Sequence, residues 1–109
     1  MSAIITTGDD ENISAQLLRD GSTFTIATDS TVKAAIVTAA RGAILAGPVT
    51  CSSSATGAAW TTGLVVASFT SAQTGAITTY GPAILEIEVE DSAGKQTYSD
   101  SVTIVRGLI

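Results

Sequence analysis

The side chains of this 109-residue chain that could take part in acid–base chemistry are mainly carboxylates, because the sequence contains no histidine. Without histidine it lacks the commonest general base and the commonest metal ligand, and neither a Ser-His-Asp nor a Cys-His site can form within it. Cys51 is the single cysteine, so zinc would have to bind through one thiolate and carboxylates alone. These omissions predict a protein that is not an enzyme and that binds no metal or cofactor.

Three glutamates, Glu86, Glu88 and Glu90, form the most regular row of carboxylates, alternating with apolar residues over 85–90. On a strand, side chains two residues apart lie about 7 Å apart on one face, a spacing that could suit glycoside hydrolysis. Catalytic carboxylates, however, come from different elements that line a cleft, where burial raises the pKa of one of them. We therefore interpret the row as a solvated strand face, whose repeated charge also opposes edge-to-edge pairing.

The acidic run at residues 9–11 lacks the D-x-D-x-D-G spacing of a calcium loop. Asp91 could join Asp9 or Asp10 at one end of a sandwich to hold calcium, but a turn whose side chains bind nearby backbone groups is the favoured interpretation. The glycines match neither the dinucleotide nor the Walker pattern, so no nucleotide loop is predicted.

Trp60 and Tyr80 are the aromatic residues considered for binding. Trp60 follows a loop rich in Ser, Ala and Gly, and with Tyr80 it could form a stacking platform for a sugar or a receptor. The alternative is that Trp60 fills the core at the start of a strand, with its indole N–H at the rim.

The composition disfavours nucleic acid and membrane partners. The net charge is −5 and the five basic residues are scattered singly, so there is no basic surface for phosphate backbones or anionic lipid. Only 14% of residues are charged, against 45% hydrophobic, which points to a subunit packed against copies of itself or a partner. The chain shows neither a signal peptide nor an apolar run of eighteen residues, so we expect it to be made and to fold in a cytoplasm.

Hydrophobic alternation predicts an all-β protein in a single domain over residues 1–109. Residues 83–90 place apolar and acidic side chains on opposite faces at a period of two, whereas a helix would mix them around its circumference. The other predicted strands cover residues 13–18, 24–26, 32–38, 44–45, 49–53, 60–69 and 96–106, and a short helix at 72–77 is expected to be capped by Ser71. Seven to eight strands with these turn signals predict an immunoglobulin-like antiparallel β-sandwich with at most one short helix.

The order of several short motifs carries a resemblance to a known family. They are Gly8-Asp9 before the first strand, Val-Lys-Ala-Ala at 32–35, the segment from Trp60 to Val66, Phe-Thr-Ser-Ala-Gln-Thr at 69–74, the segment from Tyr80 to Val89, and the turn from Asp91 to Lys95 before the final strand. The chain resembles the immunoglobulin-like domain of tailed-bacteriophage virion proteins. It is similar in particular to the N-terminal domain of siphophage upper-baseplate proteins and to stand-alone prophage structural proteins of about this length.

This resemblance implies a non-catalytic structural subunit of the virion, made in the host bacterial cytoplasm. The favoured role is a tail-tip or baseplate component that docks tail or fibre proteins; the alternatives are a capsid decoration protein and a carbohydrate- or receptor-binding module. Because the sequence ends at Ile109 without a linker or further domain, such an adaptor is expected to act by non-covalent contact.

The expected partners are other virion proteins and copies of the chain itself, which together form an oligomer in the assembled particle. Two apolar arms flank the predicted sandwich, residues 3–7 with Ile4 and Ile5, and the terminal residues with Leu108 and Ile109. Either arm could add a strand to a neighbouring subunit, or fold back as an edge strand of its own sheet.

Overall fold

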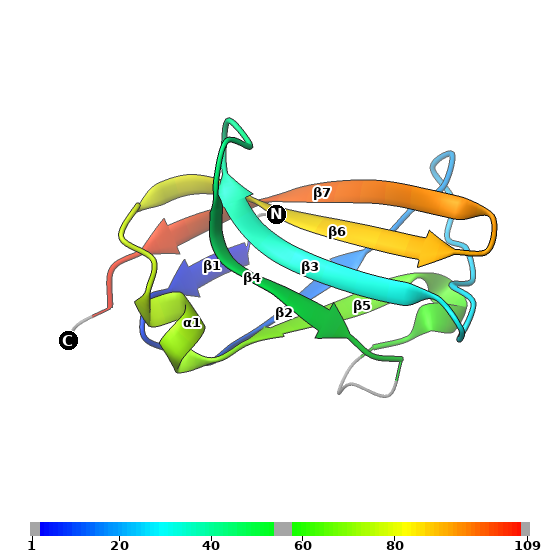
Figure 1. Cartoon of the computed structure of the whole chain (residues 1–109), viewed down its shortest axis with the longest axis horizontal. Helices are drawn as coiled ribbons and strands as arrows, with labels where there is room; N and C mark the ends of the chain where they lie inside the picture. Colours follow the sequence, from blue (N-terminus) through cyan, green and yellow to red (C-terminus); the bar gives the residue numbers. More distant parts are fainter. Residues whose placement is uncertain (1–2, 54–57, 108–109) are drawn as a thin grey trace.

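The computed structural model describes residues 3–53 and 58–107, which form an all-β sandwich of two sheets with one short α-helix (Figure 1). The larger sheet has the strand order β1-β7-β6-β3-β4, and the smaller sheet pairs β2 with β5. The elements are β1 (Ala3–Thr6), β2 (Glu11–Gln16), β3 (Thr31–Thr38), β4 (Ile44–Cys51), η1 (Trp60–Thr62), β5 (Leu64–Phe69), α1 (Ser71–Gly75), β6 (Gly81–Asp91) and β7 (Gly94–Val105).

The predicted all-β sandwich is therefore confirmed, with one departure from a purely antiparallel arrangement. β1 runs parallel to β7, with Ala3 opposite Val102 and Thr6 opposite Val105, whereas the other strand pairs are antiparallel. A parallel pair needs a long connection, and here the chain between β1 and β7 makes up nearly the whole fold.

The core lies between the sheets and follows the alternation of β3 and β6. Ile36 faces Leu85 and Ala34 faces Ile87 across these central strands, and all four side chains are at most 1% exposed. β5 supplies the other layer of the sandwich with Val65, Ala67 and Phe69. Removal of this apolar surface from water is the main favourable contribution to folding.

The sequence interpretation of residues 44–53 was wrong in dividing this segment at Gly47-Pro48. The structure has one strand, β4, which passes through a cis Gly47–Pro48 peptide, and its register against β3 shifts between Ala34 and Ile36. A bulge of this kind accommodates the irregular backbone, and a proline is tolerated because β4 lies at the edge of the sheet.

Two other predicted strands also differ. Residues 24–26 form no ladder, although the Ile26 N–H donates to the Trp60 carbonyl at 2.7 Å. Trp60–Thr62 is a 3-10 turn, and the left-handed Gly63 ends it, so that β5 begins only at Leu64. The backbone turns here and places the Trp60 side chain in the core. The hydrophobic pattern of the sequence does not predict this turn.

The predicted helix is present, but its N-cap is Thr70 rather than Ser71. The Thr70 hydroxyl accepts a hydrogen bond from the Gln73 N–H at 3.2 Å, and the Gln73 side chain accepts one from the Thr70 N–H at 2.8 Å. This reciprocal capping box satisfies backbone donors that the helix leaves without partners. Asp10 contributes by accepting a hydrogen bond from the Ser71 N–H at 2.6 Å.

Candidate functional site

The carboxylates singled out from the sequence do not form a cluster with catalytic or metal-binding geometry. Glu86 and Glu88 are half-buried and Glu90 is exposed on the outer face of β6, and Glu88 pairs with Lys95 at 3.8 Å. Asp9 and Asp10 lie against α1, whereas Asp91 accepts hydrogen bonds from Ala93 and Gly94 in the β6–β7 turn. Within residues 3–53 and 58–107, no three His, Cys, Asp or Glu side chains are grouped to hold a metal ion.

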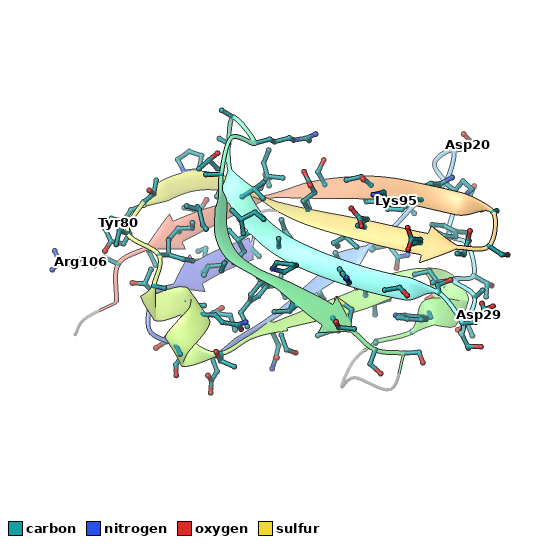
Figure 2. The ribbon with its side chains drawn as sticks, in the orientation of Figure 1. Asp20, Asp29, Tyr80, Lys95 and Arg106 are labelled. Atoms are coloured by element: carbon teal, nitrogen blue, oxygen red, sulfur yellow. The ribbon has the colours of Figure 1, made fainter. Side chains whose placement is uncertain are left out.

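The aromatic pair considered for ligand stacking is not formed. Trp60 is only 6% exposed and belongs to the core, so its ring cannot act as a surface platform, and this correction favours the core interpretation. Its indole Nε1 is buried without a hydrogen-bond partner. Tyr80 is 49% exposed and precedes β6 at the end of the molecule where Arg106 also lies (Figure 2).

The N-terminal arm forms the edge strand β1 of its own sheet instead of projecting free of the sandwich. Ile5 is fully buried in the core, so it is unavailable to a partner, whereas Ile4 on the opposite face is 63% exposed. Leu108 and Ile109, the other residues of the predicted arms, lie outside the described part of the chain.

The structure instead brings together an apolar patch on the outer face of the larger sheet, which we call the outer patch. In one row across the strands, Val37 of β3 lies between Ile44 of β4 and Ile84 of β6. Ile44 is 59% exposed, while Val37 and the neighbouring Ala35 are buried on this face without belonging to the core cluster. The outer patch consists of Ala35, Val37, Ile44 and Ile84, drawn from three strands, whereas Ile4 lies apart from it on the edge strand β1, beyond β7.

Beside the outer patch the surface forms a shallow depression of about 260 Å³, bordered by Ile44 and Pro48 on one side and by Glu86 and Glu88 on the other. Lys33 completes the border from β3. On the outer face of the larger sheet, the outer patch therefore adjoins the acidic side chains of Glu86 and Glu88. Sequence analysis missed this site because it divided β4 into two segments. The best signal for the site was the nearly continuous apolar character of residues 32–38, which is typical of a strand covered on both faces.

Cys51 ends β4 and is buried, with 5% of its surface exposed. Loss of hydration on burial disfavours the thiolate and raises the pKa of Cys51 to about 11 from an ordinary value of 9.0. The thiol therefore remains protonated and unreactive at neutral pH.

The buried thiol has a consequence for stability at alkaline pH. Between pH 9.0 and about 11 the unfolded chain releases the Cys51 proton while the folded chain retains it. Stability is therefore fully present below pH 9.0 and should fall as the pH rises through this interval, by up to about 1.4 kcal/mol per pH unit. Urea unfolding at about pH 8 and about pH 10.5 measures the change. Cys51→Ala should lose this part of the pH dependence, and an identical decline in both proteins would contradict the assignment.

No helix in the described ranges has both the length and the apolar character needed to cross a membrane. Comparisons with models of known protein families, with curated proteins and with solved structures find no match. The residues, the strand arrangement and the outer patch are thus the observations on which a functional proposal rests.

Proposed function

We propose that the chain is a non-catalytic structural subunit of a tailed-bacteriophage virion, with an immunoglobulin-like domain that docks a neighbouring protein at the tail tip or baseplate. The observation that carries the docking role is the outer patch, where Ile44 exposes 59% of its surface beside Val37 and Ile84. Contiguous apolar surface of this kind is typical of interaction sites.

The resemblance in strand and turn motifs supports the virion assignment, and the topology is compatible with it. A first strand parallel to the last, together with sheets of five and two strands, is an arrangement that an immunoglobulin-like sandwich can adopt. The acidic row beside the outer patch suits a partner surface with an apolar ridge bordered by basic side chains.

The same docking chemistry would serve a capsid decoration protein, which differs only in the surface that it covers. A carbohydrate- or receptor-binding module that used Trp60 is disfavoured, because the ring of Trp60 is in the core. Electron cryo-microscopy of purified particles distinguishes the two virion roles. A small ring of copies at the tail end supports the adaptor, and many copies over the head lattice support decoration. Absence of the chain from intact particles, checked by mass spectrometry, would overturn the virion assignment.

The outer patch makes a specific prediction about incorporation into particles. Ile44→Asp should leave the fold intact because Ile44 is largely exposed, but should reduce incorporation at least tenfold (about 1.4 kcal/mol) by placing a charge in an apolar contact. The matched control is Thr50→Asp, which adds the same charge to an exposed position of β4 beside Lys33, away from the apolar row. Equal incorporation of the two variants, measured by quantitative mass spectrometry, would show that the outer patch is not the docking surface.

A further inference from the structure

The loop between β2 and β3 carries a two-residue turn formed by Asp20 and Gly21. Arg19 and Ser22 flank this turn: the Arg19 N–H donates to the Ser22 carbonyl at 2.8 Å, and the Ser22 N–H donates to the Arg19 carbonyl at 3.0 Å. Asp20 has φ of +53° and Gly21 has φ of +79°, the left-handed conformation that such a tight turn requires at both positions. Asp20 lies at the tip of a loop that projects from the sandwich (Figure 2).

The polar groups at the centre of the turn are without partners. Within the described ranges, the Gly21 N–H donates no hydrogen bond, and the Asp20 carboxylate has neither a hydrogen-bond donor nor a cation beside it. A Cβ added at Gly21 would meet no atom within 4 Å, so nothing packs over the turn. Residues 18–23 are all exposed, and a segment with so few buried contacts opens locally at a small cost in free energy.

We propose that the Asp20–Gly21 linkage is a site of spontaneous isomerisation to isoaspartate in the folded protein. The Gly21 nitrogen loses its proton to solvent and forms a bond to Asp20 Cγ, and the hydroxyl group of the protonated carboxyl leaves as water, which closes a cyclic imide. Water then adds to the main-chain carbonyl carbon of Asp20, and the bond from that carbon to the Gly21 nitrogen breaks. The backbone now runs through Cβ and Cγ, and the former main-chain carbonyl carbon has become a free carboxylate. The composition and the charge of the protein are unchanged.

Two properties of the turn favour this reaction. Gly21 has no side chain, so its nitrogen can approach the carboxyl carbon closely. Asp20 is held in a left-handed conformation that is unfavourable for a residue with a Cβ, and leaving this conformation relieves the strain. Asp20 is also the only aspartate that glycine follows, so the sequence offers this pair of groups once.

Other aspartates lack these properties. Asp29 is exposed as well, but the N–H of the following Ser30 donates to the Ala27 carbonyl at 3.0 Å and is therefore engaged. The carboxylate of Asp91 accepts hydrogen bonds from two backbone N–H groups of the β6–β7 turn, which hold it in place. Both residues precede serine, whose side chain crowds the attacking nitrogen. Isomerisation should therefore be selective for Asp20.

The product would change the surface around the turn. Isoaspartate adds one carbon atom to the backbone, so the two reciprocal hydrogen bonds between Arg19 and Ser22 should be lost. These bonds support Arg19, whose guanidinium lies 4.3 Å from the centre of the Phe24 ring and donates to Gln96 Oε1 at 3.3 Å. The core should stay intact because the turn lies outside it. The reaction does not depend on the virion assignment, since it needs only the isolated chain.

Prolonged incubation of the full chain at neutral pH and physiological temperature tests the proposal. Chymotrypsin cleaves after Leu18 and Phe24 and releases residues 19–24; liquid chromatography and electron-transfer fragmentation then distinguish the two forms, which have the same mass. The isoaspartate fraction at Asp20 should exceed that at Asp29 by at least about tenfold, because Ser30 carries a side chain and its N–H is engaged. Equal conversion at the two aspartates would overturn the proposal.

A chain unfolded in guanidinium chloride provides the reference for the folded state. Because the turn is exposed and opens easily, the rate at Asp20 in the folded chain should lie within about tenfold of the unfolded rate. A folded chain that converts more slowly than this, or not at all, would show that the hairpin protects Asp20.

Variants at the turn test the route through the imide. Gly21→Ala should slow the conversion about tenfold, because a side chain hinders the attacking nitrogen. Asp20→Asn should react faster through the same ring, with ammonia released in place of water and a gain in mass as the amide becomes a carboxylate. Asp29→Asn is the matched control and should keep its amide over the same period. A Gly21→Ala chain that converts as fast as the wild type would reject the Gly21 nitrogen as the nucleophile. Circular dichroism checks that each variant retains the sandwich.

Discussion

Replacing Phe69 with alanine is expected to lower the free energy of unfolding by about 3–5 kcal/mol. Phe69 ends β5, is 2% exposed and is among the largest fully buried side chains. Its ring reaches β4, since a Cβ built on Gly47 would lie 3.3 Å from Phe69 Cε1. β4 and β5 belong to different sheets, so this ring joins the two layers where no hydrogen-bonded ladder does. Its loss would open a cavity between rigid strands that cannot close around it.

Phe24→Ala is the matched control, because the same side chain is removed from a partly buried position. Phe24 is partly buried against the core and stacks on Tyr98 with ring centroids 6.0 Å apart. We expect its loss to lower the free energy of unfolding by about 1–2 kcal/mol. Urea denaturation of both variants gives the comparison. Equal losses would mean that Phe69 does not hold the two sheets together.

The second large effect is expected at Gly63, where alanine should destabilise the fold by about 2–5 kcal/mol. Gly63 has φ of +79°, and an added Cβ would lie 2.9 Å from the Leu17 carbonyl oxygen and 3.1 Å from that of Phe24. Both contacts are backbone atoms, and the Leu17 N–H also donates to the Gly63 carbonyl at 2.9 Å. Relief of the clash would therefore require the segment after β2 to separate from β5.

Gly21 allows the two parts of this effect to be separated. It has the same φ of +79°, but an added Cβ would meet no atom within 4 Å. Gly21→Ala should therefore show only the cost of a left-handed alanine, about 1–2 kcal/mol. The difference between the two variants in thermal or urea unfolding isolates the close approach of the chains at Gly63. Identical losses would show that the turn conformation alone explains the need for glycine.

Several features of this protein follow from the sequence by itself. The alternation over 83–90 specified the central strand β6 and its acidic outer face, because side chains of successive residues point to opposite sides of any sheet. The short helix α1 lies where the sequence predicts a helix capped by a hydroxyl group. Thr70 and Gln73 cap it, one residue earlier than predicted. These features depend on neighbours in sequence, and local rules therefore describe them well.

Other features were decided only by the tertiary structure. Ile4 and Ile5 belong to one apolar segment, yet one is exposed and the other fully buried, because β1 pairs with β7 and presents opposite faces to core and solvent. The outer patch likewise requires β4 to lie beside β3, with Ile44 opposite Val37. Each depends on which distant strands pair and in what register, and this is determined by the combined packing of the two sheets, which no local pattern records.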